Sequence, residues 1–324
     1  MSDAADPFPL LDYLDKLIED LRAHVRPAID EAEPGQVHKA RVSTRRLKAA
    51  LDLLRPVIDD DRRKPLARVL KKLRKTLGPL RDMEVMRGHL EDMAKGRHAD
   101  AVAWLNARLT DEADQLRKKT RRKNSPSRLL AKLDAWLDVR DQTAEAREAM
   151  HSLLSQSLHL QVDAFAEQAG LLTAHERTNV HALRIAGKNL RYTLELADEQ
   201  GLELPRKTIR TFKRMQDALG LWHDFVVLAQ HTMEECVEAD LPQCEHALQG
   251  KMLEFTRRLM ARSEAHLDRF SKLWSKRGAE ICAEVRDAFP LTSGISESKT
   301  GPDLPGSDEI PTPEAPPPGA VSAA

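Results

Sequence analysis

Residues 37–54, VHKARVSTRRLKAALDLL, return in altered form as residues 180–197, VHALRIAGKNLRYTLELA. A second pair of segments follows in the same order, with LKKLRKTLGPLRDMEV at residues 70–85 and FKRMQDALGLWHDFVV at residues 212–227. The two offsets are 143 and 142 residues. Two motifs that recur in order at nearly constant spacing indicate that one unit has been duplicated, and so long a period is not that of a solenoid.

Each copy of this unit is predicted to be helical. Leucines recur every three or four positions in the third helix of the first copy, at Leu66, Leu70, Leu73, Leu77 and Leu80, which is typical of an amphipathic helix. We find about four such helices per copy and no strand-like alternation. Four helices with short loops favour a bundle, so the sequence predicts an all-α fold of two four-helix bundles related by a pseudo-two-fold axis.

Prolines, glycines and charges predict where several helices begin and end. Pro34-Gly35 is expected to separate the first two helices, and Gly78-Pro79 to kink or break the third. Residues 129–139 are predicted to form a helix that connects the copies. We assign the basic run 117–123 to a helix C-terminus rather than to ligand contact, because cations suit that end of the helix dipole.

Composition excludes several classes of protein. Among 324 residues there are 51 Lys and Arg, 51 Asp and Glu, and only 4% aromatics. Few aromatic residues disfavour a β-sandwich or barrel, no apolar run is long enough to cross a membrane, and no secretory signal is expected. Three cysteines without a CxxC pair, Cys236, Cys244 and Cys282, favour a reducing, cytoplasmic setting.

The C-terminal part of the sequence differs from the rest. Residues 291–324 are rich in Pro, Gly and Ser and contain five acids and one lysine, which gives a net charge of −4 and leaves +4 on residues 1–290. Such a segment cannot bury enough apolar surface to fold, so we predict a disordered tail. The folded domain is expected at residues 6–289, with copies at about 6–145 and 146–289.

The repeated motifs place cationic groups along helix edges. At about 100° per residue, each copy of the first motif forms a row within roughly 80° of arc and about 15 Å of length. These rows are His38, Arg41, Arg45 and Lys48, and His181, Arg184, Lys188 and Arg191. The next helix adds Arg68, Lys71, Lys72 and Lys75 in the first copy, and Arg210, Lys213 and Arg214 in the second. The second motif ends in Arg81-Asp82 and His223-Asp224, whose aspartates we expect to pair with arginine or to cap a helix.

A Lys and Arg face opposite a leucine stripe is most often only a solvated surface. Here the rows contain almost no acids and recur at matched positions in both copies. Like charges at i and i+4 destabilise an isolated helix by a few tenths of a kcal/mol, and a bound anion would offset that cost. We therefore favour anion binding, with His38 and His181 either as donors to phosphate or as structural residues.

The four quoted segments resemble the CHAD domain, the conserved histidine α-helical domain, over nearly the whole chain apart from the tail. The resemblance implies two four-helix bundles around a basic central pore, and binding of inorganic polyphosphate with association with polyphosphate granules. No β-rich region or ExExK run of an accompanying CYTH domain is found, so a standalone domain is expected. The implied contact residues are His38, Arg41, Arg45, Arg46, Lys48, Arg68, Lys71, Lys72, Lys75, Arg81, His181, Arg184, Lys188, Arg191, Arg210, Lys213, Arg214 and His223.

The expected function is non-enzymatic binding of polyphosphate, with granule-associated proteins as further partners. A bare polyanion needs point charges and bidentate arginine contacts, whereas single-stranded nucleic acid also needs aromatic platforms, which the rows lack. A general site for nucleic acid or an acidic protein is the alternative. A phosphohydrolase is less favoured, because no P-loop is present, no carboxylate cluster lies in the rows, and Arg81 at the counterpart of His223 cannot act as a base. We expect no catalytic residue, metal, cofactor or membrane partner.

Overall fold

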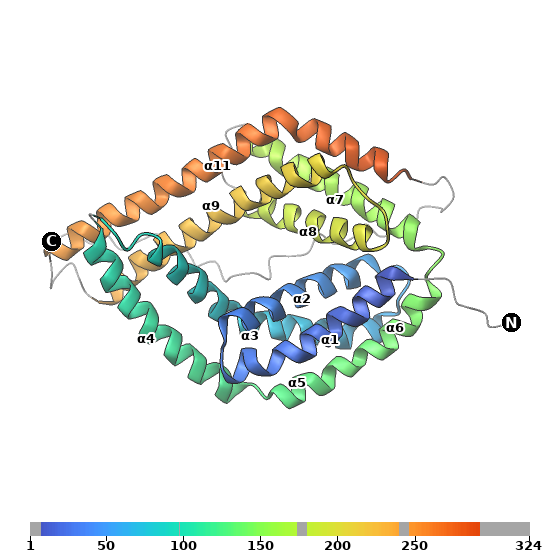
Figure 1. Cartoon of the computed structure of the whole chain (residues 1–324), viewed down its shortest axis with the longest axis horizontal. Helices are drawn as coiled ribbons and strands as arrows, with labels where there is room; N and C mark the ends of the chain where they lie inside the picture. Colours follow the sequence, from blue (N-terminus) through green and yellow to red (C-terminus); the bar gives the residue numbers. More distant parts are fainter. Residues whose placement is uncertain (1–7, 97, 174–179, 240–245, 292–324) are drawn as a thin grey trace, which may run out of the picture. The chain divides into compact units, whose positions relative to one another are not determined.

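The computed structural model describes residues 8–96, 98–173, 180–239 and 246–291. Within these ranges the chain is helical and contains no strand, as predicted (Figure 1). The first copy contains α1 (Pro9–Asp30), α2 (Pro34–Leu53), α3 (Asp60–Glu91) and α4 (Ala99–Lys123). The second contains α7 (Met150–Thr173), α8 (Val180–Glu199), α9 (Arg206–Glu238) and α11 (His246–Ala288). Between them lie α5 (Pro126–Lys132), the 3-10 turn η1 (Leu133–Ala135) and α6 (Trp136–Glu145).

Some of the sequence predictions concern residues that the structure does not describe. Residues 292–324, predicted to form a disordered tail, and Cys244 lie outside them. Cys236 and Cys282 are buried free thiols. None of the described helices is long and apolar enough to span a bilayer.

Pro34-Gly35 lies at the boundary between α1 and α2, as predicted, whereas Gly78-Pro79 does not break α3. Pro34-Gly35 opens α2 instead of forming a loop before it, because a proline in the first turn has no hydrogen bond to lose. Gly78-Pro79 lies inside α3, which continues to Glu91, so the pair does not end the helix. The buried stripe goes on beyond the proline, through Met83 and Met86, and its packing outweighs the one lost hydrogen bond.

The buried side chains form two hydrophobic clusters, and neither coincides with one copy of the repeat. The larger cluster joins α1, α2, α7 and α8 with the first part of α3, the first part of α9 and the last part of α11. The smaller cluster joins α4 with the last part of α3, the later part of α9 and the first part of α11. The two copies therefore share both cores, and the described residues between Phe8 and Leu291 form one compact unit.

The second repeated motif lies where each long helix passes from one cluster to the other. In α3, Leu80 belongs to the larger cluster and Met83 to the smaller one. In α9 the change falls between Leu219 and Phe225. The polar residues at the end of the motif are thus placed between two apolar cores.

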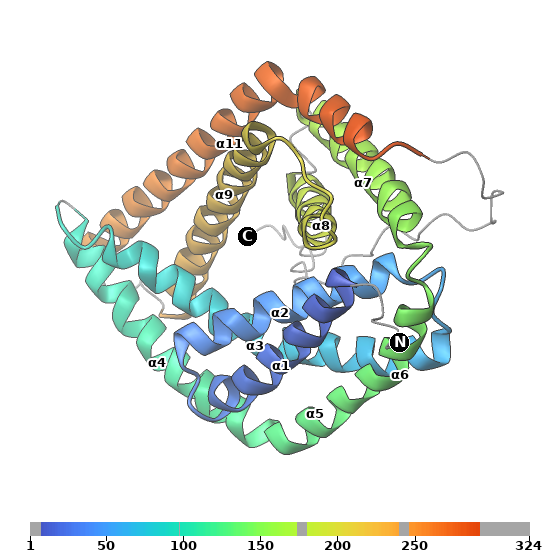
Figure 2. The same ribbon diagram turned by 45° about the vertical axis from the view of Figure 1, so that its right-hand side comes forward.

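The copies also meet directly where α8, which is seen almost end-on in Figure 2, contacts α2. Glu195 on α8 accepts a hydrogen bond from Arg46 Nε on α2 at 2.8 Å and another from Arg191 Nε at 2.9 Å. Further contacts join α3 and α4 to α9, and α4 to α11. One carboxylate therefore connects equivalent helices of the two copies.

Close packing of α7, α8 and α9 requires a glycine at position 187. A Cβ atom there would lie 2.0 Å from Gln216 Nε2 and 3.0 Å from Phe165 Cε2. Phe165 is fully buried and meets Phe212 edge-on, with ring centroids 5.5 Å apart. The end of the Gln216 side chain would have to move away, and the fully buried ring of Phe165 would have to shift within a closely packed core.

Replacing Gly187 with alanine is expected to lower the free energy of unfolding by about 1–3 kcal/mol, because buried side chains must shift. Gly220→Ala is the matched control, since nothing lies within 4 Å of a Cβ at that helical position. Alanine there should raise the free energy of unfolding by roughly 0.5–1 kcal/mol. Urea unfolding followed by circular dichroism measures both values, and equal stabilities would contradict the packing account.

Candidate functional site

The first cationic row follows α2 and is anchored to α3. His38 is exposed, whereas Arg41 and Arg45 are half-buried. Arg41 Nη1 donates to the backbone oxygen of Arg74 at 3.2 Å, and a Cβ at Gly78 would approach the same nitrogen to 3.0 Å. In this copy the glycine of the second motif thus makes room for an arginine of the first.

The second row follows α8 and meets the second motif on α9. His181, Arg184 and Lys188 are half-buried, and the ring of His181 stacks on that of His223 with centroids 6.2 Å apart. Burial lowers the pKa of His223, and the charges of Arg184 and Lys188 act in the same direction against the opposing Asp224 carboxylate. The structure therefore brings these predicted site residues together around one imidazole.

Asp224 lies between imidazoles from both copies. Its carboxylate oxygens are 3.5 Å from His223 Nδ1 and 3.6 Å from Nε2 of His89, a residue of α3. Burial alone would raise the pKa of Asp224, but the two imidazoles and the charge of Arg184 outweigh it and hold the pKa well below its usual value. Two histidines therefore lie beside this aspartate, and the charge of Arg184 also acts on it.

Asp82, the counterpart of Asp224, responds to charges from both copies. The residue is exposed, but the surrounding protein removes water from its carboxyl group and so raises its pKa. The charges of Arg41, His223 and Arg45 oppose this rise. Because the arginines belong to α2 and the histidine to α9, groups from both copies meet at this point. We call the following residues the central polar cluster: Arg41, Arg45, Asp82, Arg184, Lys188, His223 and Asp224.

Several predicted cations already have acidic partners within the chain. Arg46 and Arg191 share Glu195, Lys48 Nζ lies 2.5 Å from Asp52, and Arg81 Nη1 lies 2.5 Å from Glu84. The rows themselves contain almost no acids, but acids outside them neutralise these four cations. Three of the four pairs join residues one turn apart on the same helix, a spacing that the sequence shows; Glu195 reaches Arg46 only through the tertiary fold.

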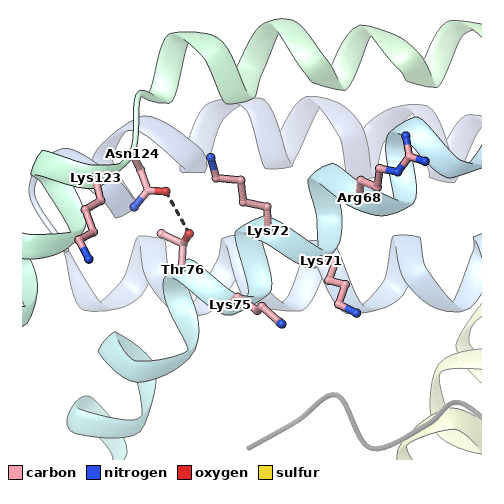
Figure 3. Close-up of a pocket in the computed structure, with 7 residues that line it drawn as sticks. All are labelled: Arg68, Lys71, Lys72, Lys75, Thr76, Lys123 and Asn124. Carbon is pink, nitrogen blue, oxygen red and sulfur yellow. Dashed lines mark hydrogen bonds between the residues drawn. The ribbon is translucent and has the colours of Figure 1, made fainter. Parts of the chain in front are cut away.

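A second basic region forms a pocket on α3, with a volume of about 470 Å³. Its lining residues are Arg68, Lys71, Lys72, Lys75, Thr76, Lys123 and Asn124, with no acid among them (Figure 3). In Figure 3, Lys71 and Lys75 extend to one side of α3, and Arg68 and Lys72 to the other. All four are exposed, so the predicted cluster forms a band around the helix rather than a closed cage.

The pocket includes residues from the end of α4 that the sequence assignment missed. Asn124 Nδ2 donates to the Thr120 oxygen at 2.9 Å, and the Thr76 hydroxyl donates to Asn124 Oδ1 at 3.3 Å. This pair ties the C-terminus of α4 to α3 and brings Lys123 beside the α3 lysines. The run 117–123 does end a helix, as predicted, but its last residue also lines the pocket. Its high density of cations was the available signal.

The equivalent cations of the second copy are less organised. Arg210, Lys213 and Arg214 are exposed on the first part of α9, and they make no ion pair with any residue that the structure describes. Asp217 follows them where the first copy has Lys75. The structure therefore shows two different surroundings for sequence positions that correspond in the repeat.

Comparison with known proteins agrees with this architecture. The family model described as the CHAD domain matches residues 12–232, which is more than half of the chain, and the chain belongs to this family. A crystal structure of the CHAD domain from the plant Ricinus communis is similar at 20% sequence identity, with a TM-score of 0.56. That match covers 88% of this chain and 91% of the plant domain, and it supports the fold. A search against curated proteins gives no significant match.

The lowered pKa of His223 predicts how stability responds to acid. Its ordinary value is 6.5, and the folded value is lower because the ring is buried. As the pH falls through that ordinary value, the unfolded chain takes up a proton at His223 before the folded chain does, so this group lowers the free energy of unfolding. The loss continues until the pH reaches the folded pKa. Urea unfolding at pH 7.5, 6.5 and 5.5 should show a smaller loss for His223→Gln than for the unchanged chain; parallel curves would refute this role.

Proposed function

We propose that this CHAD-domain protein binds inorganic polyphosphate without catalysing its turnover. The observation that carries the proposal is the α3 pocket, which is lined by five cations and no acid. Arginine and lysine bind phosphate oxygens through charge-assisted hydrogen bonds, and a band of them suits a chain of phosphates better than one compact anion. Family membership adds support, since it is compatible with a role connected to polyphosphate.

The rows on α2 and α8 extend this proposed surface. We infer that they line a basic pore between two bundles, as the resemblance to the CHAD domain implies. Support comes from the packing of α2 on α8 and from Asp82, whose carboxyl responds to charges from α2 and α9. In this arrangement His38 and His181 would stand at the start of each row as further donors to phosphate. Each row would follow one stretch of the polyphosphate chain.

Binding of this kind would obtain its free energy largely from the release of counterions. Each phosphate that is neutralised by a lysine or arginine frees condensed cations, so affinity falls steeply with salt. The formal net charge of the whole chain is zero, but local clusters of one sign still produce a strong field. We propose that the protein acts in the cytoplasm and associates with polyphosphate granules, because its ligand would be concentrated there.

A general polyanion site is the second candidate, and the same cationic surfaces favour it. Titration with long-chain polyphosphate and with single-stranded DNA of matched charge separates the two. Tighter binding of polyphosphate supports the proposal, since the pocket contains no aromatic side chain on which bases could stack. Equal affinities would favour the general site. The absence of turnover is proposed because the α3 pocket contains no carboxylate that could hold a catalytic metal ion. It is tested by measuring phosphate release.

Removing charge from the central polar cluster tests the pore. The quadruple change Arg41→Ala, Arg45→Ala, Arg184→Ala and Lys188→Ala is expected to weaken polyphosphate binding at least about 100-fold. It should also flatten the salt dependence, by roughly 0.7 in the logarithmic slope for each phosphate that the variant no longer neutralises. The measurement is calorimetric titration at several salt concentrations, with helicity checked by circular dichroism.

The matched control removes the same number of positive charges from exposed positions on α11, namely Arg257, Arg258, Lys272 and Lys276. This control should change the affinity much less, because its residues lie outside the central polar cluster and the α3 pocket. If the two quadruple variants bind equally well, binding depends on net charge alone and the assignment of the pore is wrong.

Lys123 tests the α3 pocket separately. Lys123→Gln is expected to weaken polyphosphate binding by about tenfold, because one charge-assisted hydrogen bond is lost. Lys119→Gln, an exposed position four residues earlier on the same helix, should leave the affinity unchanged because Lys119 does not line the pocket. An equal effect of both changes on the titration would show that the pocket itself is not a binding site.

A further inference from the structure

A cluster of different chemistry lies at the other end of α9, where α4 packs against it. Glu112 of α4 faces His231 and Glu235 of α9, and one ligand atom from each lies within 4.8 Å of the others. These residues line a cavity of about 1060 Å³ together with three more acids, Asp111, Glu234 and Glu238. The polyphosphate proposal uses none of these residues.

Two of the three distances between the ligand atoms are close to those of a metal-ligand set. His231 Nε2 lies 3.1 Å from Glu112 Oε2 and 3.8 Å from Glu235 Oε1. Nitrogen and oxygen ligands at about 2.0–2.2 Å from a tetrahedral zinc ion stand roughly 3.3 Å apart, which falls between these two values. His231 and Glu235 are four residues apart on one helix, so the backbone already places both on the same face.

Two atoms in the cluster lack the hydrogen bonds that burial normally requires. Glu112 Oε2 and His231 Nε2 are inaccessible to solvent, and neither completes a hydrogen bond with any residue that the structure describes. Both point toward the centre of the cluster, as their 3.1 Å separation shows. Buried polar atoms without partners are rare in native proteins, and a bound ion is one way in which such atoms are satisfied.

The surroundings favour a cation and hold the ligands in place. Glu234 and Glu238 add two more carboxylates to the cavity beside the three proposed ligands. Glu235 is 7% exposed and accepts a hydrogen bond from Arg108 Nε through its other oxygen, which fixes the carboxylate. The second ring nitrogen of His231 lies 3.9 Å from Glu234, on the side where zinc-bound histidines commonly meet a carboxylate.

We propose that Glu112, His231 and Glu235 bind a divalent transition-metal ion, with Zn²⁺ as the best match. One imidazole and two carboxylates suit this class better than Mg²⁺, which prefers oxygen ligands alone and octahedral geometry. The open cavity leaves room for water as a fourth ligand. Because Glu112 belongs to the first copy and the other two ligands to the second, the ion would link the two copies at the smaller core.

The test is calorimetric titration of the metal-free full chain with ZnCl₂, without polyphosphate, which itself binds metals. One Zn²⁺ per chain is expected, with at least about 100-fold weaker binding by His231→Ala and Glu112→Gln, since loss of an outer-sphere partner alone costs about 10–100-fold. MgCl₂ should not compete. Zn²⁺ should also raise the unfolding midpoint of the unchanged chain by about 5 °C, and this shift should vanish in both variants.

His151→Ala is the matched control, since this exposed histidine on α7 lies outside the cluster and its loss should leave zinc binding intact. Circular dichroism measures whether each variant is folded. Glu112→Gln keeps the size of the side chain, so it still tests the site if His231→Ala does not fold. Failure of the unchanged chain to bind Zn²⁺, or equal binding by Glu112→Gln, would overturn the proposal. The result is independent of polyphosphate binding, which uses other residues.

Discussion

The fold depends on two long helices that each cross two hydrophobic cores. α3 and α9 contribute apolar side chains to the larger cluster in their first part and to the smaller cluster in their last part. Where each helix passes between the clusters, neither apolar core buries its side chains. Polar residues are therefore found at these positions. The repeated motif therefore positions Asp82, His223 and Asp224 together, between the cores and next to the cationic rows.

The charged side chains of this molecule occur in three kinds of surroundings. Arg46, Lys48, Arg81 and Arg191 are neutralised by acids of the chain itself. The α3 pocket is lined by cations without acids, which makes it the more suitable place for an anionic ligand. The cluster around His231 has an excess of acid and suits a cation. A neutral chain can thus present separate surfaces of opposite sign, since the field near each is set by its own groups.

The duplication produced two copies that are similar in outline but different in detail. Arg41 presses against Gly78, whereas nothing approaches a Cβ at the corresponding Gly220. Gly187 on α8 is required by Gln216 and Phe165, while Thr44 holds the corresponding place on α2 and is fully buried. Such differences are expected once two copies share cores, because each then packs against different neighbours.

The sequence by itself determined the helical class, the duplication and the amphipathic faces, because these follow from local periodicity and from the comparison of one segment with another. It also identified the cationic rows, whose spacing along a helix is fixed by the backbone. Only the tertiary structure decided that α3 continues through Gly78-Pro79, that Glu195 neutralises Arg46, and that Lys123 joins the α3 pocket. The same holds for Glu112, His231 and Glu235, which come together from two helices. These outcomes depend on contacts between residues far apart in the chain, which packing establishes and local patterns do not encode.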